Sequence, residues 1–294
     1  MVSKESFLTN NLRRMGFERL AWGLRRLYTP VDSLALVLEV GSGGNPYPRS
    51  NVLLDAYEFT RERHWAPLTT DRPTVLGFVE NLPFKNKAFD FVIASHVLEH
   101  SKDPEKFLSE LQRVAKAGYI EVPDAFMERV NPYRDHRLEI TLRGECLIIL
   151  KKRSWIVDEY LNEIYEDRVK KCMTSWLIPN HPFDFHVRYY WEDSIQYHIV
   201  NPEVNADWEP PKAGLKIVRP GFVRRLKEYV HNSLRLALTQ SKRNKSIELL
   251  PLMRCASCHS GNLRIKDSLI QCATCGTVYP IRNGLFVMNE ANQC

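Results

Sequence analysis

The sequence predicts an α/β protein, a parallel sheet with helices packed on it, followed by a small cysteine-rich unit. Three observations predict this fold. The first half alternates short apolar strands with helical or loop segments, a glycine turn joins the first two strands, and two C-x-x-C pairs follow residue 249. A chain of 294 residues is long enough for one large core and an accessory module. We therefore expect two domains, residues 1–248 and 249–294.

Five apolar, β-branched runs predict the strands of the sheet. They cover residues 36–40, 52–55, 74–79, 89–95 and 119–123. Residues 103–116 have helical spacing, with Asp103 and Pro104 at the N-cap and first turn. The apolar face of this helix consists of Phe107, Leu108, Leu111 and Val114. We expect Gly118 to end it.

Two further segments flank the sheet. In residues 1–30, leucines recur at roughly helical spacing among arginines, which predicts an amphipathic helix packed on the domain. A membrane-surface helix or a targeting peptide is the alternative. Residues 125–220 are interpreted as an insertion that encloses the substrate. It contains a hairpin of 138–142 and 145–150, a helix near 156–171, and an aromatic alternating stretch from 185 to 200.

The stretch LVLEVGSGGNPYPRSNVLLD, residues 36–55, predicts two parallel strands joined by a glycine turn, the second ending on Asp55. Gly41, Gly43 and Gly44 allow a tight turn and close approach of a ligand to the backbone. Only ten residues, 41–50, separate the strands, and two of them are proline. That leaves little room for the helix that usually crosses between parallel strands.

The missing helix discriminates between cofactors. A dinucleotide places its pyrophosphate on a helix N-terminus, so NAD and FAD are disfavoured. S-adenosyl-L-methionine carries no phosphate and does not need that dipole. Asp55, at the end of the second strand, is placed to accept hydrogen bonds from ribose hydroxyls. The turn therefore favours S-adenosyl-L-methionine.

The C-terminal unit has the pattern of a zinc ribbon. Thirteen residues separate the CASC and CATC knuckles, and a short hairpin follows at Asn283-Gly284. Four thiolates close a tetrahedral zinc site, and closed sites are structural. The predicted Zn2+ ligands are Cys255, Cys258, Cys272 and Cys275. Of the other cysteines, Cys146 and Cys172 are interpreted as small buried residues.

Residues 37–124 resemble the class I S-adenosylmethionine-dependent methyltransferases, in particular the large type 11 group. The likeness is carried by LEVGSGGNP at 38–46, Leu54-Asp55, VENLPF at 79–84, FDFVIASHVLEH at 89–100 and YIEVPD at 119–124. It implies a Rossmann-like sheet of seven strands. It also implies a cofactor site made of Glu39, Gly41, Ser42, Gly43 and Gly44 near the methionine, Asp55 on the ribose, Phe78, Val79 and Glu80 beside adenine, and Ser95 and His96 closing over the cofactor.

The chain departs from the family pattern in two places. Asn45-Pro46 replaces the third glycine and the helix start, and Phe78 stands where many relatives have an acid that accepts the adenine amino group. The backbone of Val79 can serve instead, and Phe78 is alternatively a core residue.

Residues 253–289 are similar to the small zinc-ribbon family that binds and activates tRNA, ribosomal-RNA and translation-factor methyltransferases. CASC, CATC and YPIRNGLFVMN carry that likeness. We expect the strand at 285–288 to dock on an exposed edge of this chain's own methyltransferase domain.

Four residues are candidates for a general base, should the acceptor have to lose a proton. They follow strands four and five: His96, His100, Asp124 and His136. His136 is preferred, and His100 is alternatively a packing residue. His96 and His100 stand at i, i+4, but a catalytic metal needs a third ligand and none is evident nearby.

The partners follow from charge and composition. The formal charge of +6 is concentrated in residues 221–250, a run that favours either RNA contact or a solvated helix face. No apolar run is long enough to span a bilayer, so we expect a cytoplasmic protein without stable membrane insertion. The predicted function is methyl transfer to an unidentified small molecule, lipid or sugar. The alternatives are an RNA or translation-protein methyltransferase, and a non-catalytic cofactor-binding protein that recruits a partner through its ribbon.

Overall fold

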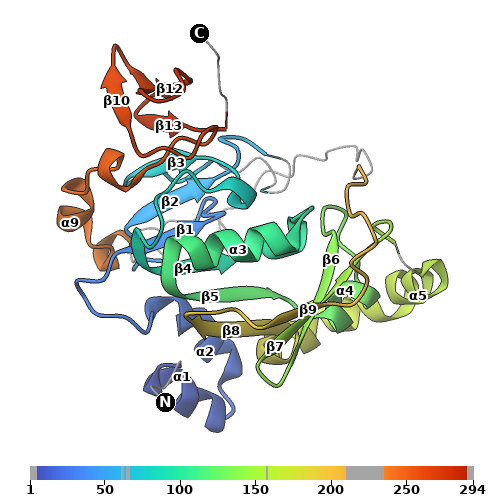
Figure 1. The fold of residues 1–294 in the computed structure, drawn as a ribbon. Helices are drawn as coiled ribbons and strands as arrows, with labels where there is room; N and C mark the ends of the chain where they lie inside the picture. Colours follow the sequence, from blue (N-terminus) through green and yellow to red (C-terminus); the bar gives the residue numbers. More distant parts are fainter. Residues whose placement is uncertain are drawn as a thin grey trace.

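One long sheet runs through the protein, as the computed structural model shows (Figure 1). The structure describes residues 5–60, 63, 67–156, 158–209, 233 and 235–289. Within this part, the strand order is β10-β11-β12-β13-β3-β2-β1-β4-β5-β8. The first five strands of the chain are β1 (Val37–Val40), β2 (Val52–Asp55), β3 (Thr74–Leu76), β4 (Phe89–Ser95) and β5 (Ala115–Pro123). They are parallel, whereas β8 (His186–Glu192) pairs antiparallel with β5.

The helices are short apart from α3 (Pro104–Val114), which lies against the sheet. The others are α1 (Phe7–Arg14), α2 (Glu18–Leu24), α4 (Ala125–Val130), α5 (Glu159–Ile164), α6 (Lys170–Cys172), α7 (Ile178–Asn180) and α9 (Ser241–Lys245). Asp103 caps α3 by accepting the Lys106 N–H at 3.0 Å, as predicted. The four residues of its predicted apolar face are all buried in the main core.

The predicted strands are confirmed in position, but the end of α3 is not. The helix stops at Val114, and Gly118 lies inside β5 opposite Trp191. A Cβ atom at Gly118 would lie 2.7 Å from the Trp191 ring. This glycine is therefore explained by the close approach of β8, not by the end of a helix.

The described residues do not supply all seven strands that the family resemblance implies for the parallel sheet. In the described residues that part of the sheet has six strands, β3-β2-β1-β4-β5-β8. The predicted hairpin, β6 (Leu138–Arg143) and β7 (Cys146–Lys151), forms a separate sheet with β9 (Tyr197–Ile199). Most of the insertion therefore folds beside the main sheet, and its strand β8 extends the main sheet.

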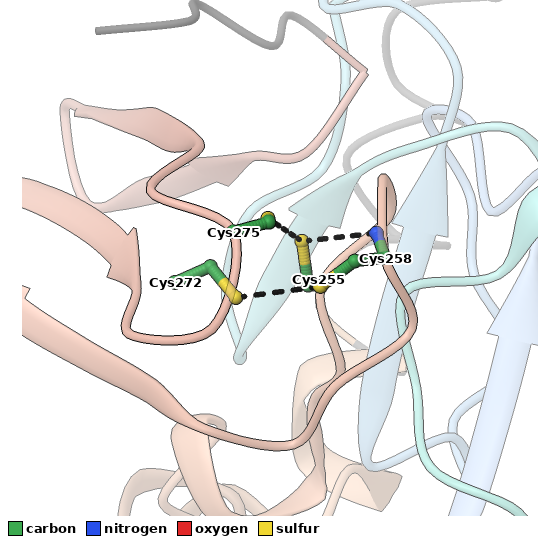
Figure 2. A group of neighbouring side chains, drawn as sticks. All are labelled: Cys255, Cys258, Cys272 and Cys275. Carbon is green, nitrogen blue, oxygen red and sulfur yellow. Dashed lines mark hydrogen bonds between the residues drawn. The ribbon is translucent and has the colours of Figure 1, made fainter.

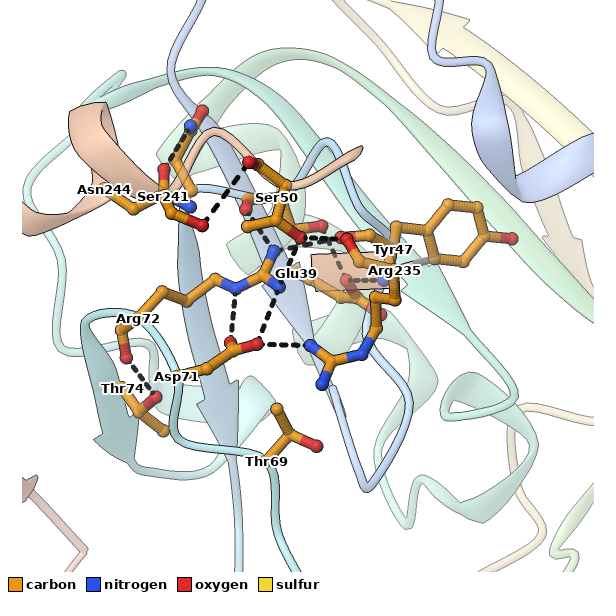
Figure 3. Close-up of polar contacts among 12 residues, drawn as sticks. Glu39, Tyr47, Ser50, Thr69, Asp71, Arg72, Thr74, Arg235, Ser241 and Asn244 are labelled. Atoms are coloured by element: carbon orange, nitrogen blue, oxygen red, sulfur yellow. Dashed lines mark hydrogen bonds and ion pairs between the residues drawn. The ribbon is translucent and has the colours of Figure 1, made fainter. Parts of the chain in front are cut away.

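The crossover between β1 and β2 has no helix, as predicted. A polar network supports it instead (Figure 3). Arg72 donates to the carbonyls of Ser50 at 2.6 Å and Tyr47 at 3.1 Å, and it also pairs with Asp71. Asp71 in turn pairs with Arg235, which comes from the segment before α9. A distant segment thus packs against the loop where a crossover helix would otherwise lie.

The N-terminal segment is helical, but its predicted packing is wrong for most of its apolar residues. Gly16 has a φ of +81° and separates α1 from α2, so one continuous stripe does not form. Leu8, Met15, Leu20 and Leu27 are all more than half exposed. Arg25 anchors the segment through a bidentate pair with the buried Glu121 of β5, at 2.6 and 2.8 Å.

The C-terminal cysteine-rich unit docks on the parallel sheet, as predicted. Its strands are β10 (Leu263–Lys266), β11 (Leu269–Cys272), β12 (Val278–Arg282) and β13 (Leu285–Val287). β13 pairs in parallel with β3, and the N–H of Met288 donates to the Leu76 carbonyl at 2.7 Å. The pairing covers an edge strand that would otherwise be open to aggregation.

A second contact joins the ribbon to the loop after β3. Arg254 donates to the carbonyl of Leu82 at 3.2 Å and to the carboxylate of Glu110 at 3.1 Å. Asn81 donates to the carbonyl of Ala256, which lies in the first cysteine knuckle, at 2.9 Å. The ribbon therefore supports both the edge of the sheet and the loop that follows β3.

Candidate active site

A cleft of about 640 Å³ lies at the carboxyl ends of β1 to β4. Parallel sheets bind their ligands at this edge. Seven of the eleven predicted cofactor residues line the cleft: Gly41, Gly43, Asp55, Phe78, Val79, Glu80 and His96. They follow four different strands, so the topology of the sheet brings them together.

The glycine turn is tightly constrained. Gly41 and Gly43 have φ values of +62° and +59°, a region that disfavours other residues. A Cβ atom at Gly41 would lie 2.2 Å from the Val97 side chain. The Gly43 N–H donates to Asp55 Oδ2 at 3.0 Å, which ties the turn to the end of β2.

Asp55 already has several partners in the cleft. Its Oδ1 accepts from the Tyr57 N–H at 3.2 Å and from Arg63 Nη1 at 2.7 Å. A ribose hydroxyl that hydrogen-bonds to this oxygen would compete with Arg63. The carboxylate is therefore held in place before any ligand binds.

The other four predicted cofactor residues, Glu39, Ser42, Gly44 and Ser95, are not in the wall of the cleft. Glu39 lies beneath the turn, where its Oε2 accepts from the Tyr47 N–H at 2.8 Å and the Ser50 hydroxyl at 2.5 Å. Burial raises the pKa of Glu39. Its contacts hold the crossover loop from below.

Two aromatic rings form one side of the cleft. Phe78 and Tyr57 meet edge to face at 5.9 Å and are 41% and 48% exposed. Phe78 is therefore a wall residue, and its interpretation as core is wrong. Glu80, beside it, accepts from the Ser101 hydroxyl at 2.6 Å.

His96 follows β4 with a φ of +57° and lies between two buried acids. Burial lowers its pKa, but ion pairs with Glu121 at 3.5 Å and Glu99 at 3.4 Å outweigh burial and raise the pKa to about 9. The imidazole is protonated at neutral pH, and a protonated imidazole cannot accept a proton. This environment argues against His96 as a general base.

The remaining base candidates differ in access to the cleft. His100 lines it, whereas His136 stacks edge to face on His100 with ring centroids 4.7 Å apart. Asp124 caps α4 by accepting the Phe126 N–H at 2.9 Å, and its second oxygen accepts from Thr141 at 2.7 Å. Both oxygens of Asp124 are thus engaged away from the cleft.

The structure also brings together residues that the sequence did not connect. Glu99, His100 and His136 each offer one ligand atom, and these atoms lie within 4.8 Å of one another. Burial raises the pKa of Glu99, but the imidazoles around it lower it to about 2, so the carboxylate is ionised. Because His136 lies 36 positions after His100, only the tertiary fold reveals this cluster.

The four ribbon cysteines converge on one point (Figure 2). Cys255 Sγ lies 3.7 Å from Cys275 Sγ, and Cys258 Sγ lies 3.6 Å from Cys272 Sγ. Sulfurs bound to one tetrahedral Zn2+ at about 2.3 Å are separated by about 3.8 Å. The cysteines form no disulfides, and their four sulfurs lie within 4.8 Å of one another, which is compatible with a tetrahedral zinc site.

The other two cysteines that the structure describes do not share an environment. Cys146 is half-buried and Cys172 is exposed, so the prediction that both are buried is wrong. The helix predicted near 156–171 begins at Glu159 and continues to Asn180, although π-helical turns at Tyr165–Val169 and Met173–Leu177 interrupt it.

Comparison with known proteins begins with the parallel sheet. Residues 52–120 match the family model of a methyltransferase domain. This match covers β2 to β5 and α3, and the chain has the Rossmann-like fold of a class I methyltransferase.

The similar curated proteins include two methyltransferases. A demethylmenaquinone methyltransferase from Streptomyces avermitilis is 30% identical over 131 residues, which are 40% of this chain and 53% of that protein. An ajmaline N-methyltransferase from Rauvolfia serpentina is 42% identical over 43 residues, 15% of each chain. The chain spans about half or less of the length of these relatives.

Two solved structures also match. One is the Haloferax volcanii complex of the Trm112 methyltransferase activator with a methyltransferase, at 18% identity and a TM-score of 0.29, covering 46% of this chain and 73% of that one. The other is an S-adenosylmethionine-dependent methyltransferase from Aquifex aeolicus, at 18% identity and a TM-score of 0.27, covering 41% and 75%.

Proposed function

We propose that this protein transfers a methyl group from S-adenosyl-L-methionine to an acceptor bound in the same cleft. One observation carries the proposal: the glycine turn, Asp55 and the Phe78 loop line a single cleft above a crossover without a helix. A phosphate-free adenosyl cofactor suits that arrangement better than a dinucleotide does. The methyltransferase family match in residues 52–120 supports the same cofactor.

Each wall of the cleft has a distinct role in this proposal. The glycine turn lets the cofactor approach the backbone, and Asp55 accepts hydrogen bonds from its ribose. Tyr57 and Phe78 stack on adenine, which replaces the acid found at position 78 in many relatives. Methyl transfer from a sulfonium is an in-line displacement, so positioning of the two substrates supplies most of the acceleration, up to about 7–11 kcal/mol.

We also propose that the ribbon cysteines hold one structural Zn2+. Cys255, Cys258, Cys272 and Cys275 would close its coordination sphere, since their sulfur separations match a tetrahedral site. The ion would supply folding free energy to a unit with little core of its own.

A small molecule, lipid or sugar is the preferred acceptor. The cleft has the size of small-ligand sites. Of the basic run 221–250, Arg224, Arg225 and Lys227 lie outside the described residues. Arg235 and Arg243 are engaged within the protein, with Asp71 and with the carbonyls of Ser33 to Ala35. This use leaves fewer cations for RNA, so RNA and translation-protein acceptors rank second and an inert cofactor binder third.

Calorimetry with S-adenosyl-L-methionine and its demethylated product tests the cofactor assignment. Phe78→Ala should weaken binding about 5- to 150-fold, because stacking on an aromatic side chain contributes about 1–3 kcal/mol per base. Asp55→Asn should also weaken it, whereas Phe7→Ala, a change at an aromatic residue that is 82% exposed, should not. Wild-type protein that binds neither ligand would refute the proposal.

Transfer itself is tested with radiolabelled cofactor and cell extract. The products are fractionated into RNA, protein, lipid and small molecules. Label in the lipid or small-molecule fraction supports the preferred acceptors, and label in RNA or protein supports the second. No label in any fraction, with cofactor binding intact, would favour the inert binder.

A further inference from the structure

We propose that Glu99, His100 and His136 bind one divalent transition-metal ion, of the Mn2+ or Zn2+ kind, in the wall of the cleft. This site is separate from the ribbon cysteines. Its existence rests on the three residues and their surroundings, whereas its role in catalysis rests on the proposed methyltransferase function.

The three ligands come from two elements that the fold brings together. Glu99 and His100 lie in the 3₁₀ turn Leu98–His100 after β4, and His136 precedes β6. The Arg137 N–H donates to the Glu99 carbonyl at 2.7 Å, which fixes the two segments side by side. Ligand atoms around one ion are about 3–4 Å apart, so separations within 4.8 Å close with small side-chain movements.

Both histidines are oriented as metal ligands usually are. His100 Nδ1 lies 3.1 Å from the Asp135 carbonyl, and His136 Nδ1 lies 2.6 Å from Glu128 Oε2. Because a carbonyl and a carboxylate only accept, each Nδ1 carries a proton, and in the neutral imidazole this leaves the lone pair on Nε2. A metal-bound imidazole commonly donates its other N–H in this way.

Glu128 is itself held in place. It is 3% exposed, and its Oε1 accepts from Lys152 Nζ at 2.8 Å and from the Tyr133 N–H at 3.1 Å. The Lys152 side chain is fully buried beside it. This buried pair fixes the orientation of His136 whether or not a metal is bound.

Glu99 gives the independent indication of a missing ligand. It is 2% exposed, and neither carboxylate oxygen accepts a hydrogen bond from any described residue. His96 Nδ1 makes an ion-pair contact with Oε1 at 3.4 Å. One ion-pair contact without a hydrogen bond leaves this buried carboxylate with unused acceptor capacity, which a metal ion would satisfy.

The donor set indicates the class of ion. Two imidazole nitrogens and one carboxylate oxygen suit Mn2+, Fe2+, Co2+ or Zn2+, whereas four thiolates select Zn2+. Three protein ligands also leave coordination positions open, as in catalytic sites. His100 lines the cleft, so a molecule bound on the open side would lie within it.

An ion at this site would favour an oxygen acceptor. Glu99, His100 and His136 would hold the ion, which would lower the pKa of an acceptor hydroxyl so that its proton passes to solvent. The oxygen lone pair then forms a bond to the methyl carbon, the carbon–sulfur bond breaks, and its electron pair returns to sulfur. The products are a methyl ether and the neutral thioether of the cofactor.

Manganese binding to the full-length, zinc-loaded protein tests the site. Electron paramagnetic resonance of free aqueous Mn2+ counts the bound ions, and Mn2+ does not displace Zn2+ from thiolates. We expect one Mn2+ per wild-type chain. Glu99→Gln and His136→Ala should lose it, and Glu128→Gln should weaken it about tenfold or more.

Matched substitutions control for nonspecific effects. Glu105→Gln and His198→Ala change exposed residues of the same types and should bind Mn2+ as the wild type does. Thermal melts and ribbon zinc content show whether each variant is folded. In a folded Glu99→Gln protein, the Mn2+-induced rise in Tm should disappear.

The outcomes separate the metal from the methyltransferase proposal. Wild-type protein that takes up neither Mn2+ nor a second Zn2+, or folded ligand variants that bind like the wild type, would overturn the metal site even if the cofactor binds. Specific Mn2+ binding without cofactor binding would leave the site standing and refute the proposed function.

Discussion

The four ribbon cysteines and the cluster of Glu99, His100 and His136 both consist of side chains that commonly bind metals, yet they are built in opposite ways. The cysteines lie within 21 consecutive residues, on two short knuckles. Glu99 and His100 meet His136 only because the segment after β4 lies beside the segment before β6. The first group is a closed set of four thiolates, and the second is a set of three that opens on a cleft. A closed site suits structure, and an open one suits chemistry.

The largest expected effect comes from opening the closed site. Cys272→Ser should abolish the fold of the ribbon, since zinc contributes on the order of 10 kcal/mol or more to such units. Zinc content and amide exchange in residues 255–287 measure the loss. Cys172→Ser, at an exposed thiol, is the matched control.

The same variant shows whether the two groups are independent. If Cys272→Ser protein still binds Mn2+, the cleft group stands on the methyltransferase domain alone. Loss of both metals would show that the ribbon cysteines and the cleft group are not independent but form one cooperative unit.

A smaller effect is expected from the contact between the two regions. Arg254 is nearly buried and donates to both Leu82 and Glu110. Arg254→Met should cost about 2 kcal/mol in the free energy of unfolding, because it removes hydrogen bonds that involve a charge. Urea denaturation measures this cost, with the exposed Arg264→Met as control. An unchanged unfolding free energy would show that the ribbon is held by strand pairing alone.

The smallest effect is expected at Asp71, whose carboxylate is paired with both Arg72 and Arg235. Pairing with Arg72 and Arg235 outweighs burial and lowers the pKa of Asp71. A lowered folded pKa stabilises the protein above the unfolded pKa, and that stability is lost as pH falls through the folded pKa. Asp71→Asn should therefore destabilise the protein at neutral pH, and the difference from wild type should narrow below about pH 4. A pH series of thermal melts measures the stability difference between Asp71→Asn and the wild type. A difference that does not change with pH would contradict the lowered pKa of Asp71.

Much of the fold was predictable because its signals are local. Apolar runs located the five parallel strands, Asp103 marked the start of α3, and the cysteine spacing located the ribbon. The docking strand at 285–288 was also predicted, since a similar family supplied the partner. Gly118 misled because a glycine can mark either a helix end or a close backbone approach, and only β8 decides between them.

The candidate site was predictable only along single strand ends. Asp55 and the glycine turn belong to one short stretch, so their proximity could be inferred. His136 was singled out as a base, but its pairing with His100 and Glu99 depends on where the insertion folds. The prediction that the N-terminal leucines pack on the domain failed for a related reason. Gly16 breaks the helix, and the nearly regular spacing of the leucines does not reveal that break.

The parallel pairing of β13 with β3 has a consequence for biosynthesis. A chain is synthesised from its N-terminus, and its domains tend to fold as they emerge from the ribosome. β3 leaves the exit tunnel long before β13 is made, so during translation β3 is an unpaired edge strand of the nascent sheet. Chaperone occupancy should be highest in that interval and should fall once the ribbon cysteines have bound the proposed Zn2+.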